Sequence, residues 1–340
     1  MNLLQRTIQV LSIARTIRLG LLGIVLVALA GCGQSTEPSA GRVNQAKPVI
    51  VVSIPPLASL IEPLVSPWGQ VHCLLPVGSE PHDFQPTAYQ MNAAADAKLL
   101  VVVGRRLDDW AVKATRRANG QHVAPPIIRF ADALSPASPN TTGSPSDVAA
   151  SSHDHGSHED IALSLNPHLW LDPVYCRQLL DYLLPALEKL APDQTARDHT
   201  RQAKAQMDTQ LDQLDQTYRS ALSQVRRKDL VTFHNAFDLL ANRYGLHVAA
   251  HLIDIDLASD GQATSDDLIK LIQTIRQLKI SVIYSEPQFP DQAVGVIARE
   301  TGVQVLKLDP LGGPGLPGYN TYFEMMASNL KILQQGQNTP

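Results

Sequence analysis

Four side chains that can bind a metal ion lie in short, turn-forming motifs along this chain. His82 belongs to the segment Ser-Glu-Pro-His-Asp-Phe, and His168 belongs to Asn-Pro-His-Leu-Trp. His234 and Asp309 each directly follow a short apolar run. Zinc is bound by imidazole nitrogen, thiolate sulfur and carboxylate oxygen, commonly in a four-coordinate shell. Each position taken singly is a weak signal, because a lone histidine at a strand end is more often a capping or surface residue; the combination points to a metal site.

The residues around His82 alternate between predicted strands and helices. β-branched and apolar runs bounded by Gly, Pro or Asp predict buried strands, and longer segments between them have helical patterns. The predicted elements, in order, are strand 49–54, helix 57–65, strand 71–75, helix 87–97 and strand 99–103. Strands that alternate with helices form a mainly parallel sheet. We therefore expect an N-terminal α/β lobe over residues 48–190.

The same alternation resumes in the last third of the chain. The predicted elements, in order, are strand 230–233, helix 237–244, strand 246–252, a helix that begins at Ser265, strand 282–284, helix 291–301, strand 303–308 and helix 319–333. We expect a second, similar α/β lobe over residues 228–335. In such sheets ligand sites form in the loops after the carboxyl ends of the strands. We expect the three histidines and Asp309 to lie at such strand ends.

A long helix is predicted between the two lobes. Residues 197–225 contain neither Pro nor Gly, and apolar residues recur there at steps of three and four. These residues are Met207, Leu211, Leu214, Tyr218, Ala221 or Leu222, and Val225. A helix of this length can span a small domain at about 1.5 Å per residue. We expect residues 191–227 to be a rigid connection between the lobes.

The N-terminus has the pattern of a bacterial export signal. Three arginines and no acidic residue precede the apolar run 21–30, and Leu-Ala-Gly follows up to Cys32. A basic region, a short apolar region and small residues are typical of a secretory signal. Cys32 resembles the cysteine of a lipobox, which implies a signal peptide over 1–31 and a lipid anchor on this residue. An uncut membrane anchor is the alternative, and both place the body of the protein outside the cytoplasm.

Two polar segments are predicted to lack packed structure. Residues 32–47 are rich in Ser, Gly, Pro and Gln, which favours a flexible tether. Residues 135–160 are rich in Pro, Ser, Thr and Asn, and they favour a mobile loop. The loop carries His153, His155 and His158. These histidines are either an accessory zinc collector or chance residues of a solvated polar loop.

The cysteines and the charge of the chain argue against a thiolate metal site and against nucleic-acid binding. Cys73 and Cys176 form no Cys-x-x-Cys motif, so they are weak metal ligands and are either a disulfide or two buried thiols. The formal net charge is −4, and without residues 1–31 there are 25 basic and 32 acidic side chains. A nucleic-acid-binding surface needs a clustered basic face. We therefore expect no nucleic-acid partner.

Five motifs in a fixed order resemble the cluster A-I family of zinc and manganese solute-binding proteins of ABC importers. The motifs are Gly78 to Thr87, Asn166 to Pro173, Phe233-His234, Ser285 to Phe289 and Leu308 to Gly312. The resemblance covers nearly all of residues 48–333. It implies two α/β lobes bridged by one rigid helix, with the metal in the cleft between them. It also implies a monomeric, lipid-anchored protein that carries no enzymatic activity and delivers its ion to an ABC permease.

The resemblance assigns the metal ligands to His82, His168, His234 and Asp309. Whether Glu80 reaches the ion is open, and Glu286 either orients a ligand, as carboxylates around metal sites do, or caps a strand end. Zinc-type relatives tend to have histidine at position 234 and manganese-type relatives a carboxylate, since imidazole suits zinc and carboxylate oxygen suits manganese. Zinc is therefore the expected cargo. Because imidazole binds a metal only when deprotonated, we expect binding to weaken as the pH falls through about 6.5.

Three alternatives remain beside zinc transport. The first is a manganese-binding homologue of the same family. The second is a zinc hydrolase, because three histidines and a bound water form a catalytic centre; the chain has no His-Glu-x-x-His motif that would supply a general base. The third is a surface adhesin, which would need an exposed surface patch for its partner.

Overall fold

Two four-stranded parallel sheets form the framework of the protein. The computed structural model describes residues 46–118, 124–134, 165–253 and 264–340. The strands of the N-terminal lobe are β1 (Val49–Val52), β2 (Gln70–Cys73), β3 (Ala97–Val102) and β4 (Ile127–Arg129). Those of the C-terminal lobe are β5 (Asp229–His234), β6 (His247–Ile253), β7 (Val282–Ser285) and β8 (Gln304–Lys307). The prediction of two α/β lobes with parallel sheets is confirmed.

Both sheets have the same strand order. The first sheet runs β2-β1-β3-β4 and the second runs β6-β5-β7-β8, and every pairing is parallel. In each lobe the first strand thus lies between the second and the third, so the chain changes direction across the sheet there. Crevices at the carboxyl ends of strands beside such a switch point are the usual ligand sites of open α/β sheets.

Helices cover the sheets and follow them in the chain. They are α1 (Pro55–Val65), α2 (Ala88–Ala93), α3 (Asp109–Ala118), α4 (Phe130–Ala133), α6 (Pro173–Leu190), α7 (Gln194–Ser223), α8 (Asp238–Arg243), α9 (Ser265–Leu278), α10 (Gln292–Thr301) and α11 (Tyr322–Gln337), with the 3-10 turns η1 (Leu169–Leu171) and η2 (Asn235–Phe237). Their first residues follow from capping: Thr87, Asp172, Asp193, Thr264 and Thr321 each accept a backbone N–H of the first turn.

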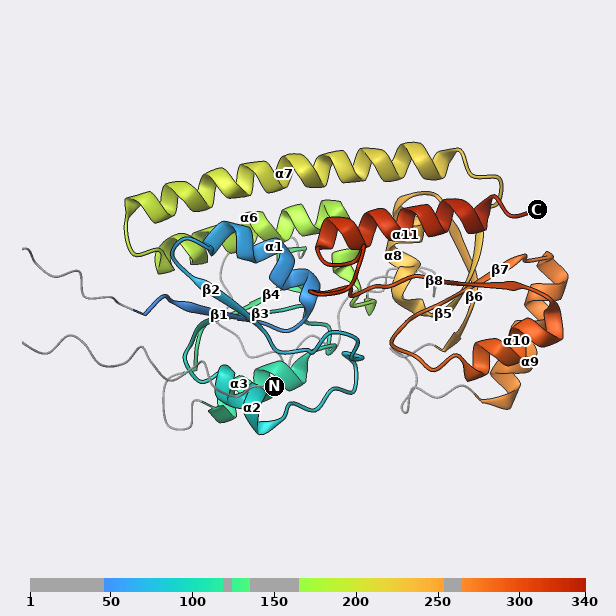
Figure 1. The fold of residues 1–340 in the computed structure, drawn as a ribbon, viewed down its shortest axis with the longest axis horizontal. Helices are drawn as coiled ribbons and strands as arrows, with labels where there is room; N and C mark the ends of the chain where they lie inside the picture. The colour runs from blue at the N-terminus through green and yellow to red at the C-terminus, as the bar shows by residue number, and fades with distance from the viewer. Residues whose placement is uncertain (1–45, 119–123, 135–164, 254–263) are drawn as a thin grey trace, which may run out of the picture. The chain divides into compact units, whose positions relative to one another are not determined.

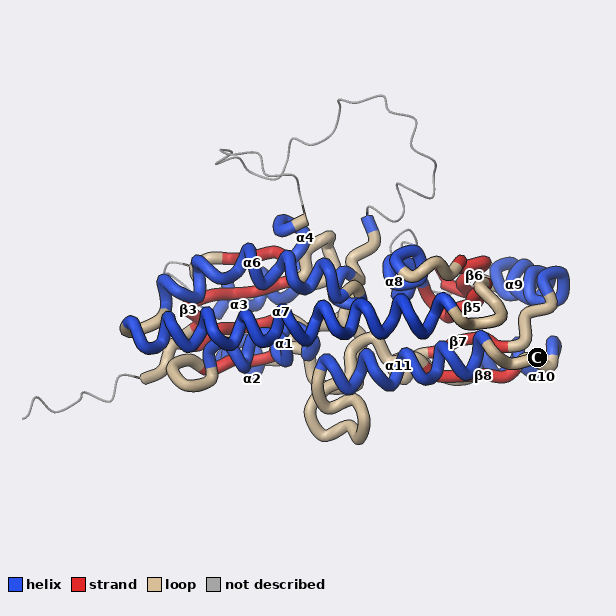
Figure 2. Tube along the Cα trace, turned by 90° about the horizontal axis from the view of Figure 1, so that it is seen from above, coloured by secondary structure: helices blue, strands red, loops and turns tan. Residues whose placement is uncertain are grey.

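The long helix α7 packs against elements of both lobes. It has 30 residues, Gln194–Ser223, and its buried face includes Met207, Leu211 and Tyr218. It lies against α1, α6 and α11 (Figures 1 and 2). The Tyr218 hydroxyl also donates a hydrogen bond of 2.6 Å to the Met326 carbonyl in α11. The predicted long helix is therefore present, and its ends lie within three residues of the ends of the predicted segment 197–225.

One continuous apolar core joins the two lobes. It runs from β1 and α1 through α6 and α7 to β7 and α11, and it includes Ile50, Leu179, Leu211, Tyr284 and Leu333. The described residues accordingly form one compact unit. A wide opening of the lobes would expose part of this core to water, at about 25 cal/mol per Å² of apolar surface. The fold therefore favours small local movements and disfavours a wide hinge opening of the two lobes.

Several elements were not predicted from the sequence. The strand β4 has only three residues, and α3, α4 and α6 were also missed. Helix α6 contains Pro185, a residue type that usually ends a helix. It persists because Leu179, Leu183 and Leu187 are fully buried and the helix packs along α7. Tertiary packing here outweighs the local signal.

The structure bears on the predictions for the two cysteines and on the presence of a membrane-spanning helix. Cys73 and Cys176 are free thiols, so the disulfide alternative is wrong. The alternative of two buried thiols holds for Cys176, which is buried, and is wrong for Cys73, which is exposed on the edge strand β2. No helix within the described residues is long and apolar enough to span a membrane. The signal peptide, Cys32 and the greater part of the tether lie outside the described residues.

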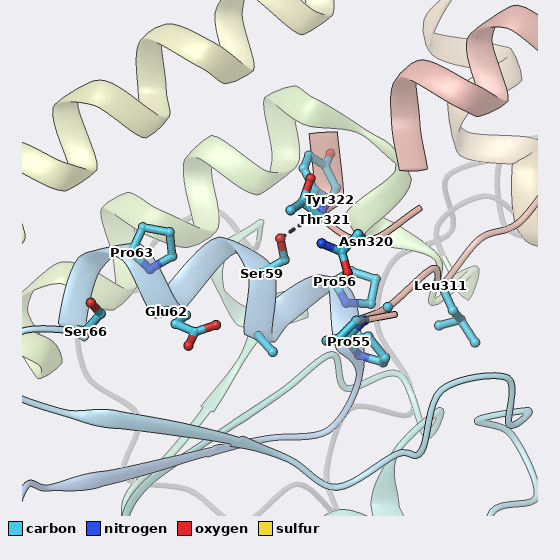
Figure 3. Close-up of a pocket in the computed structure, with 13 residues that line it drawn as sticks. Pro55, Pro56, Ser59, Glu62, Pro63, Ser66, Leu311, Asn320, Thr321 and Tyr322 are labelled. Carbon is cyan, nitrogen blue, oxygen red and sulfur yellow. Dashed lines mark hydrogen bonds between the residues drawn. The ribbon is translucent and has the colours of Figure 1, made fainter. Parts of the chain in front are cut away.

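A surface pocket of about 440 Å³ lies between α1 and the loop that precedes α11. Figure 3 shows three of its four prolines, Pro55, Pro56 and Pro63, along α1, with Glu62, the one acidic residue of the lining, next to Pro63. At its centre the Tyr322 N–H donates to the Ser59 hydroxyl at 2.8 Å, which ties the start of α11 to α1. The pocket has no histidine among its lining residues, so it is not the metal site.

Replacing glycine by alanine at two helical positions should have opposite effects on the stability of the protein. A Cβ at Gly336 in α11 would lie 2.0 Å from the buried Tyr284 hydroxyl oxygen. The helix gains about 1 kcal/mol from Gly→Ala, but overpacking a core costs about 1–3 kcal/mol. We expect Gly336→Ala to lower the free energy of unfolding in urea titrations.

The matched control is Gly295→Ala in α10. There a Cβ would meet only the Arg299 guanidinium, at 3.6 Å. This variant should be more stable than the wild type by up to about 1 kcal/mol. Equal effects of the two substitutions would contradict the packing of α11 on β7.

Candidate metal centre

His82 lies in a loop whose shape is fixed by the neighbouring Glu80. The two carboxylate oxygens of Glu80 accept the His82 backbone N–H at 3.0 and 2.9 Å, and one also accepts the Asp83 N–H at 3.2 Å. The Trp110 indole donates to the Pro81 carbonyl at 2.7 Å. The loop between β2 and α2 is thus pinned on both sides of the histidine, and the His82 side chain is 10% exposed.

His168 lies in the loop before η1 and is fully surrounded by protein. Asn166 Oδ1 accepts the His168 backbone N–H at 2.9 Å and also lies 2.9 Å from His168 Nδ1. The Trp170 ring packs beside the imidazole, and its indole donates to the Pro310 carbonyl at 2.6 Å. Two residues later Asp172 caps α6 and forms an ion pair with Arg243 of α8 at 2.6 Å. This loop of the N-terminal lobe therefore contacts the C-terminal lobe repeatedly.

His234 is the last residue of β5, at the switch point of the second sheet. Its Nδ1 lies 2.5 Å from Glu286 Oε1, and both side chains are nearly fully buried. Glu286 directly follows β7, the strand next to β5. A carboxylate beside Nδ1 leaves Nε2 to act as a ligand, as in the carboxylate–histidine pairs of metal sites. The structure thus places Glu286 against His234, on the side of the ring away from Nε2.

The three imidazoles converge on one point through their Nε2 atoms. His168 Nε2 lies 3.4 Å from His82 Nε2 and 3.2 Å from His234 Nε2. Within the described residues this is the one group of three potential ligand atoms that all lie within 4.8 Å of one another. A tetrahedral zinc site with Zn–N distances of about 2.0–2.1 Å requires nitrogens about 3.3 Å apart. The spacing therefore fits a small tetrahedral cation.

Two carboxylates lie near this point. Glu80 Oε1 is 3.9 Å from His82 Nε2, and Glu80 lines the same small space as His168 and His234. Asp309 is nearly buried just after β8, but it does not belong to the group within 4.8 Å. One Asp309 oxygen, Oδ1, accepts Gln288 Nε2 at 2.8 Å and the N–H groups of Leu311 and Gly312 at 3.0 Å.

The space beside His168 and His234 is small, and half of the residues that line it are apolar. It has room for about 10 Å³, which is about one water-sized sphere. Trp170, Phe289 and Leu311 line it beside the histidines. The walls therefore leave place for one ion or one water and for no organic ligand.

Burial changes the protonation of the site. It lowers the pKa of His82 from near 6.5 to about 3, with a further lowering from the nearby His234. It also lowers the pKa of His168 well below 6.5, again with contributions from its neighbours His234 and His82. Burial raises the pKa values of Glu80 and Glu286, against the lowering by their hydrogen bonds. The two imidazoles are thus neutral and ready to bind metal below the pH near 6.5 expected from the sequence.

The expectation that every ligand ends a strand is correct only in part. His234 ends β5 and Asp309 follows β8, but His82 and His168 lie in loops whose side-chain and backbone hydrogen bonds fix them. Asn166 was not singled out from the sequence, although asparagine side chains commonly bond the backbone two residues further along the chain. His153, His155 and His158 lie outside the described residues.

Comparison with known proteins identifies one family over most of the chain. Residues 50–336 match the family described as zinc-uptake complex component A, periplasmic. The chain is 26% identical over 324 residues to the zinc-binding lipoprotein AdcA of Streptococcus pneumoniae (strain ATCC BAA-255 / R6), an alignment that covers 94% of this chain and 61% of AdcA. The chain thus spans less than two thirds of that relative.

Two further relatives have nearly the length of this chain. The high-affinity zinc uptake system protein ZnuA of Bacillus subtilis is 25% identical over 310 residues, covering 90% of this chain and 92% of ZnuA. The solved structure of the periplasmic zinc binding protein TroA from Treponema pallidum has a TM-score of 0.70 at 20% identity and covers 86% of this chain and 100% of TroA. This structural likeness shows the same fold.

The lowered pKa values predict an unusual titration. In the metal-free protein, the ring signals of His82 and His168 should not shift in NMR spectra between pH 7.5 and 5.5, because both imidazoles stay neutral. In urea the same residues should titrate near 6.5. For the same reason, protonation of His82 and His168 should not weaken zinc binding as the pH falls through 6.5. A midpoint near 6.5 in the folded protein would contradict the buried arrangement.

Proposed function

The chain belongs to the family of periplasmic zinc-uptake component A, and from this membership we propose that it binds one zinc ion outside the cytoplasm and delivers it to an ABC importer. His82, His168 and His234 hold the ion through Nε2. The observation that carries the proposal is the spacing of these atoms, at 3.4 and 3.2 Å, across two lobes. A protein that collects an ion needs such a closed shell and no substrate cleft.

The donor set supports zinc over manganese. Three neutral imidazoles provide nitrogen ligands, which suit zinc, whereas manganese prefers carboxylate and carbonyl oxygen. The one carboxylate nearest to His234, Glu286, lies on the Nδ1 side of the ring, away from the Nε2 cluster. The centre of the site is therefore nitrogen-rich.

A carboxylate completes the shell. The sequence predicts Asp309, and the geometry gives Glu80 an equal claim, since Glu80 lines the space between the imidazoles and lies 3.9 Å from His82 Nε2. The family resemblance supports Asp309, and the position of Oδ1 among three donors supports a structural role for that oxygen. Two substitutions separate these claims.

The partner and the anchor are part of the same proposal. The ion passes to an ABC permease in the cytoplasmic membrane, and a lipid on Cys32 keeps the monomeric protein near that membrane. The name of the AdcA relative, a zinc-binding lipoprotein, supports the anchor. The shared apolar core supports release by small loop movements, because a wide hinge opening would expose it.

The size of the site supports binding over hydrolysis. A zinc hydrolase must place both a water and a substrate carbonyl at the ion. The space beside the imidazoles has room for about one water-sized body, and Trp170, Phe289 and Leu311 line it. A transported ion fits there, and a peptide or ester does not.

Removing a ligand tests the shell. Substitution of a residue that supports a metal ligand typically weakens metal affinity by up to about 100-fold. His168→Ala and His234→Ala remove a ligand itself, so each should weaken zinc binding by more than this. The control is His247→Ala, at an exposed histidine that pairs with Asp229 on the edge of the second sheet. Competition with a chelator of known affinity measures all three. Wild-type affinity in either ligand variant would contradict the proposed site.

The fourth position is tested by Glu80→Gln and Asp309→Asn. Each removes one charge at nearly unchanged size. The variant at the true ligand should lose at least about tenfold in zinc affinity, and the other should change less. Retained affinity in both variants would contradict a carboxylate ligand. Thermal unfolding of the metal-free variants controls for general destabilisation.

A further inference from the structure

One buried amide touches both ligand loops. Asn166 is 2% exposed. Its Oδ1 accepts the His168 backbone N–H at 2.9 Å and lies 2.9 Å from His168 Nδ1. Its Nδ2 donates to the Asn235 carbonyl at 2.7 Å, and Asn235 directly follows His234. The same side chain therefore reaches from the N-terminal lobe to the backbone beside the ligand of the C-terminal lobe.

The orientation of this amide is fixed by backbone groups. A backbone N–H can only donate, so the Asn166 atom that faces the His168 N–H is the oxygen. A backbone carbonyl can only accept, so the atom that faces the Asn235 carbonyl is the NH₂ group. Both contacts give the same assignment. The position of the two amide atoms thus follows from chemistry that allows no flip.

The fixed amide in turn fixes the tautomer of His168. Oδ1 is an acceptor, so the His168 Nδ1 that lies against it must carry the hydrogen. A neutral imidazole has one N–H and one lone pair. The lone pair of His168 is therefore on Nε2, which points to the Nε2 atoms of His82 and His234.

We propose that Asn166 is a positioning residue that sets the ligand tautomer of His168 and, through Asn235, ties this setting to the contact between the lobes. The inference rests on the proposed function for its zinc-release part only. We call the bond from Asn166 Nδ2 to the Asn235 carbonyl the interlobe clasp. Asparagine is suited to both tasks because it presents an acceptor and a donor from one rigid plane.

Other residue types separate the two tasks. Asp at position 166 keeps an oxygen for His168 and loses the donor of the interlobe clasp. Ala loses both. The pair Asn166→Asp and Asn166→Ala therefore distinguishes the tautomer from the clasp, and each variant is a folding control for the other.

The first measurement needs no metal. ¹⁵N-histidine NMR of the full, metal-free chain distinguishes a protonated Nδ1 from a protonated Nε2. Wild type and Asn166→Asp should show His168 protonated at Nδ1. Asn166→Ala should shift His168 toward protonation at Nε2. An unchanged tautomer in Asn166→Ala, or a lost one in Asn166→Asp, would overturn the assignment.

The second measurement is the rate of zinc release to an excess of chelator. Both variants lack the interlobe clasp, so both should release zinc about 10- to 100-fold faster than the wild type. Ser59→Ala is the matched control, because it removes another side-chain bond between the lobes, the one to the Tyr322 N–H. It should leave the His168 tautomer and the release rate unchanged.

The outcomes separate this inference from the proposed function. Release from Asn166→Asp at the wild-type rate would overturn the role of the interlobe clasp. Equal acceleration in Ser59→Ala would overturn its specificity, since any loosening of the lobes would then suffice. Failure of the wild type to bind zinc would contradict the proposed function and leave the tautomer result intact.

Discussion

The site depends on keeping a lone pair on the inward nitrogen of each buried imidazole. A buried N–H without an acceptor costs free energy, so the partner of the outward nitrogen decides which nitrogen keeps the lone pair. At His168 this partner is Asn166, and at His234 it is Glu286. Burial keeps His82 and His168 neutral, since it lowers both pKa values. The nitrogen cluster is therefore prepared by the protein before an ion arrives.

The repeated topology brings these partners together. His234 ends β5 and Glu286 follows the neighbouring β7, so two adjacent parallel strands deliver the imidazole and its carboxylate to one edge. The N-terminal lobe contributes loops instead, and each loop is fixed by its own side-chain bonds. Helix α7 and the shared core hold the two lobes in register. The spacing of the three Nε2 atoms depends on that rigid frame.

Seven of the eight strands of the described residues were predictable because they are short apolar runs bounded by turn residues, whereas the three-residue β4 was not. His234 was predictable as the polar residue directly after such a run. The loop positions of His82 and His168 were not, because Glu80 and Asn166 fix them through contacts that no period reveals. Helix α6 was missed because Pro185 is a local stop signal that packing overrides. The fourth ligand could not be identified from the spacing of residues in the sequence, because Glu80 and Asp309 both lie in turn-forming segments.

The three ligands are not held equally, and this difference bears on how an ion leaves. Asn166 bonds both to His168 and to Asn235, the residue after His234, and the core beneath them is continuous between the lobes. The His82 backbone is bonded within its own lobe, through Glu80 and next to the bond from Trp110 to Pro81, and its side chain is 10% exposed against 3% for His234. A local movement of the His82 loop breaks one ligand bond and exposes little apolar surface. Separation of the other two requires the lobes to part. Under the proposed function, exchange of the ion therefore proceeds at the His82 side, while the pair joined by Asn166 stays assembled.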